Sequence, residues 1–250
     1  MPTLKEQKLI RSLRLKKFRQ EHRLFIVEGI KNVNCLLASS FKTEAVYHVD
    51  NWKSEIPLPA GKTEMHIVSP EWMKKVSLFE SSSSVLAIVR IPEPKKKFSF
   101  DQSVIPVLAG INDPGNLGTI IRLCDWFGIK TLVVSENTVD EFNPKTVQAT
   151  MGALFNVAVY RNGLKEFFTE NEQLYHIPVF AADMRGRPLS SIHQPEKMIL
   201  VFGSESHGIP EELHSFIREY IHIPSKGTPL AESLNAAMAA SILLHYFTRS

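Results

Sequence analysis

Three segments in the second half of the chain combine residue types that could bind and orient a substrate. The first, Asp113–Arg122, reads DPGNLGTIIR, a glycine-rich turn that leads into a helix. The first-turn amides of such a helix point outward and suit a phosphate or another anion. The structural alternatives are that Arg122 pairs with Asp125 on an exposed helix face and that Asn116 only caps the helix.

The second segment, Gly203–Pro210, reads GSESHGIP and follows an apolar run at Ile199–Phe202. Glycines on both sides of Glu205 permit a tight turn and a close approach of the backbone to a ligand. The alternative is an ordinary polar loop between a strand and a helix.

The third segment comprises Ile223–Gly227 (IPSKG) and Ser233–Ala240 (SLNAAMAA). Ser233 could cap the helix that begins there. That helix lacks a polar face over two turns, so it must be buried on most sides. The pattern leaves open whether the domain core or a dimer interface buries it.

Several common motifs are missing from the sequence. No G-x-G-x-x-G follows a strand, and there is no G-x-x-x-x-G-K-[ST], which argues against a dinucleotide site or a P-loop. The sequence also has no H-E-x-x-H and no paired C-x-x-C, so we expect no metal site. The absence of G-x-S-x-G argues against a serine hydrolase.

Alternating strands and helices must position these segments. Apolar strands are expected at Val104–Ala109, Thr131–Val134, Val157–Tyr160, Val179–Ala182, Met198–Phe202 and Tyr220–Ile223. Helices are expected at Leu117–Phe127, from Asn143-Pro144, from Pro210 and at Ser233–Phe247. This order predicts an α/β fold with a parallel sheet covered on both faces. Ligands bind beyond the carboxyl ends of such strands, in the loops 110–116, 182–187, 203–209 and 224–232.

A linker divides the chain. Ile91–Phe100, IPEPKKKFSF, contains prolines and three consecutive lysines that neither a helix nor a strand easily accommodates. We therefore predict an N-terminal domain at 1–92, a linker at 93–102 and a C-terminal domain at 103–250. In the first domain, a helix over residues 4–20, a further helix ending near Ala38 and short strands indicate a small α/β lobe.

The composition is that of an ordinary globular protein. Of the 250 residues, 44% are hydrophobic and 22% are charged. The two cysteines cannot form a disulfide framework, which suits a cytoplasmic protein. No apolar run reaches the roughly 20 residues of a membrane span, and no signal peptide is visible, so no membrane partner is expected.

The charge is distributed unevenly. Residues 1–100 hold 18 Lys/Arg and 10 Asp/Glu, a balance of +8, whereas residues 101–250 hold 11 and 16, a balance of −5. This asymmetry favours binding of a polyanion by the first half. The densest basic cluster consists of Lys5, Lys8, Arg11, Arg14, Lys16, Lys17, Arg19 and Arg23. The alternative is a solvated basic helix face.

Together and in this order, the three segments resemble the motifs of the SpoU/TrmH family of RNA 2′-O-ribose methyltransferases, in the SPOUT superfamily. The resemblance covers roughly residues 103–250. Its motif positions are Asn116, Gly118 and Arg122, then Gly203, Glu205 and Gly208, then Ile223, Pro224, Gly227 and Ser233-Leu234-Asn235. The first lobe also resembles the RNA-binding lobe of the family, best at Val27-Glu28-Gly29.

The sequence departs from the family pattern in two places. Ser225 stands where the third motif usually has Met, and five residues, Thr228–Glu232, intervene where three are usual. This affects the expected conformation of the cofactor loop at 224–232. In the first lobe, Ser81–Ser84 stands where a Gln-Gly pair is frequent, which affects the expected RNA contacts.

The resemblance implies a deep trefoil knot at the C-terminus that binds S-adenosylmethionine mainly through backbone groups. The cofactor positions it implies are Gly203, Ile223, Leu234 and, in the first knot loop, Ala182. It also implies a homodimer whose active site draws on both subunits, which the apolar last helix fits.

The resemblance further implies the roles of the polar motif residues. Arg122 is the catalytic arginine of the family, often proposed as the base, although a guanidinium scarcely deprotonates and a phosphate clamp is chemically simpler. Asn116 and Asn235 would hold Arg122 or the ribose hydroxyl by hydrogen bonds. Glu205 would fix the orientation of Arg122, and Ser233 would support the same network.

We therefore expect a cytoplasmic enzyme that methylates a ribose 2′-hydroxyl of RNA. Ribosomal RNA, and 23S rRNA in particular, is favoured because of the N-terminal lobe. The RNA would be held by exposed basic residues, for which the candidates are Arg11, Arg14, Lys16 and Lys17. The alternatives are a transfer RNA substrate and a non-catalytic RNA-binding or ribosome-assembly protein on the same scaffold.

Overall fold

The chain forms two compact units. The computed structural model describes residues 2–56, 63–79, 81–94, 97–227, 230 and 232–249. One unit comprises Met1–Glu93 and Asp140–Asn156, and the other comprises Pro94–Val139 and Val157–Ser250. Neither unit is one continuous stretch of chain, because residues 140–156 lie between two parts of the second unit in sequence.

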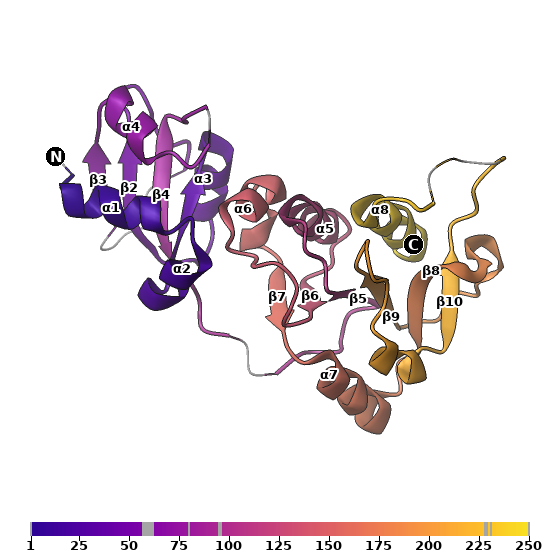
Figure 1. The fold of residues 1–250 in the computed structure, drawn as a ribbon. Coiled ribbons are helices and arrows are strands. Elements are labelled where there is room, and N and C mark those ends of the chain that lie inside the picture. The colour runs from indigo at the N-terminus through magenta and orange to yellow at the C-terminus, as the bar shows by residue number, and fades with distance from the viewer. Residues whose placement is uncertain are drawn as a thin grey trace. The chain divides into compact units, whose positions relative to one another are not determined.

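The first unit contains a four-stranded sheet (Figure 1). Its strands are β1 (Leu24–Glu28), β2 (Thr43–His48), β3 (Glu64–Ile67) and β4 (Val85–Arg90), in the spatial order β1-β4-β2-β3. The central strand β4 is antiparallel to β1 and β2, and β2 is parallel to β3. The small α/β lobe expected from the sequence is therefore present.

Five α-helices surround this sheet in the described residues. They are α1 (Leu4–Ser12), α2 (Lys16–His22), α3 (Ile30–Leu37), α4 (Pro70–Val76) and α6 (Pro144–Thr150), followed by the 3₁₀ helix η1 (Ala153–Phe155). Successive side chains of β1 point to opposite faces of the sheet, and both faces are buried here. Ile26 packs in one cluster with Ile10 of α1 and Met73 of α4, whereas Phe25 contacts the ring of Phe142, near α6.

The helix predicted over residues 4–20 is interrupted. Leu15 is extended, with φ −94° and ψ 131°, and α2 begins at Lys16. The guanidinium of Arg19 donates hydrogen bonds to the carbonyl oxygens of Leu13 (2.9 Å) and Arg14 (2.8 Å). These carbonyls lie where α1 ends and lack helical partners, so Arg19 supplies the hydrogen bonds that make the break tolerable.

The second unit is built on a six-stranded, fully parallel sheet, as the alternation of strands and helices predicts. The spatial order is β10-β8-β9-β5-β6-β7. The strands are β5 (Val104–Ala109), β6 (Thr131–Val134), β7 (Ala158–Arg161), β8 (Val179–Pro188), β9 (Met198–Gly203) and β10 (Glu219–His222). Every residue of β5 is buried, which agrees with a central strand covered on both faces.

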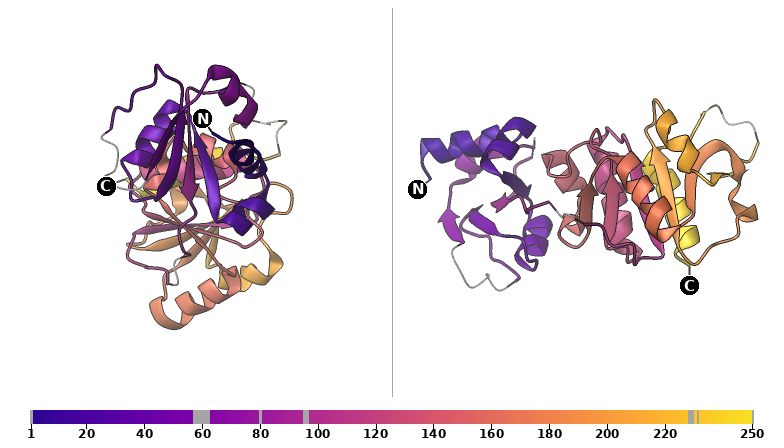
Figure 2. Two further views of the ribbon diagram at one scale, coloured as in Figure 1. Left: turned by 90° about the vertical axis from the view of Figure 1, so that its left-hand side faces the viewer. Right: turned by 90° about the horizontal axis from the view of Figure 1, so that it is seen from below.

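Helices cover both faces of this sheet. Figures 1 and 2 show α5 (Pro114–Trp126) and α8 (Ala236–Phe247) side by side on one face, with α7 (Leu164–Glu170) on the other. The shorter helices of this unit are η2 (Asn171–Tyr175), η3 (Leu189–Ser191) and η4 (Glu211–Phe216). The helix predicted to start at Pro210 is thus a short 3₁₀ helix.

Two predicted helix starts are wrong, and local hydrogen bonding gives the reason. Helix α5 begins at Pro114, and the carboxylate of Asp113 caps it by accepting the N–H of Asn116 at 2.7 Å. Asn116 therefore lies inside the first turn, and its side chain is free for another role. Helix α8 begins at Ala236 with Asn235 as its cap, so Ser233 lies outside the helix.

No helix within the described part of the chain is long and apolar enough to cross a membrane.

Candidate active site

The three motif segments meet through side-chain hydrogen bonds in the second unit. The amide nitrogen of Asn235 donates to the amide oxygen of Asn116 at 2.9 Å. The amide nitrogen of Asn116 donates in turn to Oε1 of Glu205. Asn235 and Asn116 are 119 positions apart in the sequence, and Asn116 and Glu205 are 89 apart. The contacts therefore depend on the tertiary fold.

Asn116 is positioned by the start of α5. Pro114 occupies the first turn, where its missing N–H costs nothing. With Asp113 as the cap, the Asn116 side chain points away from the helix end toward the loop after β9, where it reaches Glu205.

Glu205 is positioned by a short closed turn after β9. Ser204 and Gly208 exchange backbone hydrogen bonds of 3.0 and 2.9 Å, and Gly208 has φ +64°. A Cβ atom at Gly203 would clash with the backbone of Gly208 and Ile209. Both glycines are therefore required for the turn that presents Glu205.

Asn235 is positioned by the helix that it caps. Its Oδ1 accepts the N–H groups of Ala237 (3.0 Å) and Met238 (3.3 Å). Helix α8 packs beside α5, which brings the starts of the two helices together and explains the contact with Asn116.

Two predicted catalytic residues are not part of this hydrogen-bond chain. Arg122 is exposed on α5, and no hydrogen bond or ion pair joins it to another described residue, Asp125 included. Ser233 is exposed and likewise has no side-chain hydrogen bond within the described ranges. The orientation of Arg122 by Glu205 that the sequence suggests is therefore absent from this arrangement.

The predicted cofactor residues lie close in sequence or in the sheet to the hydrogen-bond chain. Gly203 precedes Glu205 by two residues, and Leu234, 47% exposed, directly precedes Asn235. Ile223 follows β10, and Ala182 belongs to β8, whose Ala181 pairs with Tyr220 of β10. The inserted segment Thr228–Glu232 falls partly outside the described residues, so its conformation stays a prediction.

A buried hydroxyl network that the sequence does not predict lies behind the first motif loop. Ser135 Oγ accepts the N–H of Gly110 at 2.9 Å and lies 2.8 Å from Thr138 Oγ1. Gly110, with φ +78°, begins the loop that ends at Asn116. Ser and Thr after an apolar strand carry no distinctive sequence signal, because such residues are common in loops.

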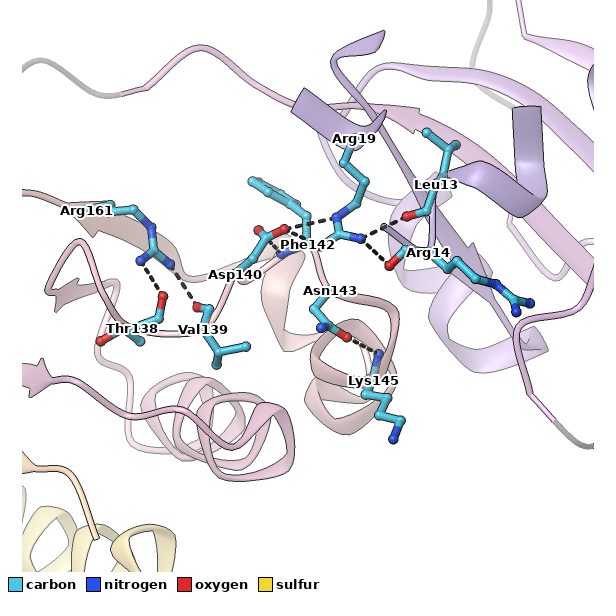
Figure 3. Close-up of polar contacts among 10 residues, drawn as sticks. All are labelled: Leu13, Arg14, Arg19, Thr138, Val139, Asp140, Phe142, Asn143, Lys145 and Arg161. Carbon is cyan, nitrogen blue, oxygen red and sulfur yellow. Dashed lines mark hydrogen bonds and ion pairs between the residues drawn. The ribbon is translucent and has the colours of Figure 1, made fainter. Parts of the chain in front are cut away.

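The exposed basic cluster is smaller than the sequence suggests. Arg11, Arg14, Lys16 and Lys17 are exposed in the first unit. Arg19 is 2% exposed, and its Nε and Nη2 contact Oδ2 of Asp140 at 2.9 and 2.6 Å (Figure 3). Counting Arg19 as part of a polyanion-binding surface is therefore wrong, because an arginine that supplies buried hydrogen bonds is not available to a ligand.

The chain near Asp140 is held by hydrogen bonds on both sides. Arg161 donates to the carbonyl oxygens of Thr138 (2.7 Å) and Val139 (2.9 Å) within the second unit (Figure 3). Asn143 caps α6 by accepting the N–H of Lys145 at 2.9 Å, as the Asn-Pro pair predicts. Each of these contacts lies within one unit, on either side of the point where the polypeptide passes from the second unit to the first.

Glu28, in the stretch that best resembles the family lobe, has a structural role. Its carboxylate is 4% exposed. It accepts hydrogen bonds from Ser77 Oγ (2.6 Å), Leu78 N (3.2 Å) and Ser83 N (3.3 Å). It thereby holds the ends of the segment that leads to β4, including part of Ser81–Ser84.

No group of three or more histidine, cysteine, aspartate or glutamate side chains in the described part of the chain could hold a metal ion.

Comparison with protein families gives two matches. The SpoU rRNA Methylase family model matches residues 103–245, more than half of the chain. The MRM3-like substrate binding domain matches residues 5–87. The first match contains all three motif segments, and the second contains the exposed basic residues.

Similar proteins span nearly the same length. The 23S rRNA (guanosine(2553)-2′-O)-methyltransferase RlmP of Bacillus subtilis is 29% identical over 94% of this chain and 93% of its own. A protein assigned to the TrmH family of RNA methyltransferases from Porphyromonas gingivalis has a similar structure, with a TM-score of 0.90 and 30% identity over 99% and 98% of the two chains. An AdoMet-bound rRNA methyltransferase from Sinorhizobium meliloti gives a TM-score of 0.85 and 27% identity over 98% and 95%.

Proposed function

The chain belongs to the SpoU rRNA methylase family, and we propose that it transfers a methyl group from S-adenosylmethionine to a ribose 2′-hydroxyl of ribosomal RNA. The observation that carries this proposal is the hydrogen-bond chain from Asn235 through Asn116 to Glu205, which joins all three motifs in one place. The similarity to RlmP and to other proteins named as 23S rRNA 2′-O-methyltransferases supports the same substrate class. Such a substrate suits a cytoplasmic enzyme.

The residues around the hydrogen-bond chain from Asn235 to Glu205 fit S-adenosylmethionine. The turn after Gly203 presents the exposed carboxylate of Glu205, and Leu234 offers an exposed apolar side chain. The carboxylate of Glu205 suits a nearby positive charge. In the proposed complex, Gly203, Ile223, Leu234 and Ala182 hold the cofactor, which supplies a methyl group already activated on a sulfonium.

We propose a division of labour along the chain. Residues 1–92 form the RNA-binding domain, residues 93–102 a linker and residues 103–250 the methyl-transfer domain. The C-terminal segment of the last domain is threaded as a deep trefoil knot. The knot is supported by family membership. Residues 95–96 of the linker fall outside the described residues.

The proposed enzyme is a homodimer, supported by apolar side chains left exposed on the two adjacent helices α5 and α8. Trp126 is 81% exposed, Met238 63% and Ile242 40%. Met238 and Ile242 are four residues apart and therefore share one face of α8. Apolar side chains gathered on neighbouring helices are typical of a surface that another protein covers.

Arg122 is proposed to clamp a phosphate of the RNA and so orient the ribose. It is exposed and has no partner within the described ranges, so its guanidinium is free to bind an anion bidentately. Asn116 and Asn235 keep the loops together, and Ser233 is proposed to act in the same network once RNA and cofactor are present.

The decisive experiment measures both cofactor binding and methyl transfer. We expect calorimetry to detect S-adenosylmethionine binding by the wild-type protein, and mass spectrometry to detect a ribose methylation that is missing from ribosomal RNA of cells without it. Arg122→Ala should retain cofactor binding and lose about 100-fold or more in transfer rate. Arg249→Ala, on an exposed arginine at the end of the chain, is the matched control.

Two results would contradict the proposal. A wild-type protein that binds no S-adenosylmethionine would favour a non-catalytic RNA-binding protein on the same scaffold. If the wild-type protein methylates transfer RNA but not ribosomal RNA, the proposed reaction is correct and the proposed substrate is wrong.

A further inference from the structure

The hydrogen-bond chain through the three motifs has only one possible direction. The backbone N–H groups of Ala237 and Met238 can only donate, so the atom of Asn235 that faces them must be Oδ1. The other end of the Asn235 amide is then a donor, and it faces Asn116. Asn116 must present its oxygen to Asn235 and therefore its own NH₂ group to Glu205.

This direction makes one oxygen of Glu205 a hydrogen-bond acceptor. Oε1 accepts the amide N–H of Asn116. Among the described residues no hydrogen bond reaches Oε2, and the side chain is exposed. One oxygen is therefore anchored while the other is open at the point where the three motifs meet.

We infer that Glu205 is the proton acceptor of methyl transfer, an inference that rests on the proposed function. The proton of the ribose 2′-hydroxyl moves to Oε2 of Glu205 as an oxygen lone pair forms the new bond to the methyl carbon. The methyl carbon–sulfur bond breaks, and its electron pair stays on sulfur. The proton later passes from Glu205 to water, which restores the carboxylate.

The other titratable groups nearby are less suited to this step. Asp113 uses its carboxylate to cap α5 at the N–H of Asn116. His207 holds its Nδ1 2.7 Å from Ser206 Oγ, so this ring nitrogen already has a partner. The guanidinium of Arg122 does not give up its proton in a protein. Glu205 combines an anchored oxygen with a free one at the point where the three motifs meet.

The test uses Glu205→Gln, which separates a base from a hydrogen-bond acceptor. The amide oxygen of glutamine can accept the same bond from Asn116, so the fold and the meeting of the loops should persist. We expect an unchanged S-adenosylmethionine affinity by calorimetry and an unchanged KM for RNA. The single-turnover rate should fall by about 100- to 10,000-fold, as when a general base is lost.

Chemical rescue of the transfer rate is a second test of Glu205 as the proton acceptor. Glu205→Ala opens space for a small carboxylate, so added formate should restore part of its transfer rate, while Glu205→Gln should not respond. Glu212→Gln, the same change at an exposed glutamate of η4, serves as the matched control and should retain the wild-type rate.

The outcomes are distinct from those that test the proposed function. An active wild-type protein with an equally active Glu205→Gln variant would show that Glu205 only accepts a hydrogen bond. Loss of cofactor affinity in Glu205→Gln, in step with the loss of rate, would assign the carboxylate to cofactor binding instead. A wild-type protein that binds no S-adenosylmethionine would overturn the proposed function itself, and this inference with it.

Discussion

The buried ion pair between Arg19 and Asp140 joins two parts of the first unit that are 121 residues apart. The side chains are 2% and 13% exposed. Asp140→Ala should cost about 3–5 kcal/mol in the free energy of unfolding, because it leaves a buried guanidinium without its counter-charge. Urea denaturation measures this loss.

The chain offers a matched comparison for this prediction. Arg23 and Glu93 also form an ion pair, at 3.0 Å, but their side chains are 38% and 90% exposed. Glu93→Ala should therefore cost less than about 1 kcal/mol. Equal losses in the two variants would show that burial of the Arg19–Asp140 pair does not determine its contribution.

The two cysteines should differ in reactivity. Cys124 is fully buried in α5, and burial raises the pKa of its thiol to about 12, whereas Cys35 is partly exposed. At pH 8, iodoacetamide should label Cys35 and spare Cys124 until the protein is unfolded, as read by mass spectrometry. Labelling of Cys124 in the native protein would contradict the burial of this face of α5.

The same thiol makes stability depend on pH. In the unfolded chain its pKa returns to about 8.5, below the folded value of about 12. The folded state then holds the proton more tightly, so the contribution of Cys124 is fully present below pH 8.5 and is lost as the pH rises toward 12.

At this scale the sequence predicts candidate residues better than it predicts their partners. Asn116, Glu205 and Asn235 could be selected from motifs, but their mutual contacts depend on the packing of α5 beside α8. Arg19 looks like its basic neighbours in sequence, and only tertiary structure reveals Asp140 as its partner. Glu28 is another example, since its three donors lie about 50 residues away.

At the scale of elements, α8 provides the clearest prediction. Met238 is exposed on this helix although the sequence around it is apolar. Met238→Glu should shift the protein from dimer toward monomer in sedimentation velocity, because a charge would be buried in the proposed interface. Thermal unfolding of the variant and of the wild-type protein should be compared in parallel, to separate loss of the dimer from loss of the fold.

Leu174→Glu is the control for Met238→Glu. Leu174 lies in η2 and is 65% exposed, close to the 63% of Met238, but it is outside the α5 and α8 faces. Its replacement should leave the sedimentation coefficient unchanged. An unaltered dimer in Met238→Glu, or a monomeric wild-type protein, would remove α8 from the interface.

Element types follow from the sequence more reliably than element boundaries. The strands at Val104–Ala109 and Thr131–Val134 are confirmed residue for residue, because apolar runs between turns define them. Helix starts depend on which side chain reaches the free N–H groups, and at α5 a carboxylate three positions before Asn116 provides the cap. The break after α1 depends on hydrogen bonds from the side chain of Arg19, which looks like its basic neighbours in the sequence.

At the scale of the molecule, the uneven charge leads to a prediction about RNA binding. Arg11, Arg14, Lys16 and Lys17 are exposed and free of acidic partners among the described residues. Changing all four to Glu should weaken RNA binding and reduce the slope of log K against log salt by about 3. Cofactor affinity, measured by calorimetry, should remain unchanged.

A smaller pair of variants controls for net charge. Lys16→Glu with Lys17→Glu removes the same charge as Lys130→Glu with Lys165→Glu, two exposed lysines of the second unit. The first pair should reduce affinity for ribosomal RNA well beyond the second. Equal effects would identify the N-terminal cluster as an ordinary solvated face.

The architecture of the whole molecule is predictable only in part. Alternating strands and helices suffice to predict the parallel sheet. They do not predict that residues 140–156, in the middle of the methylase family match, pack with the N-terminal part of the chain. Phe142 and Gln148 contact Phe25 and Asn32 there, and neither pairing can be inferred from local pattern.

The interleaving of the two units has a consequence for how this protein can be divided or inherited. Deleting residues 1–92 would remove the residues that pack against 140–156. Asp140 would lose its ion pair with Arg19, and Phe142 would lose its contact with Phe25. A chimaera that takes residues 1–92 from a relative must therefore take the relative's counterpart of residues 140–156 as well. A single cut in the sequence does not separate the two units.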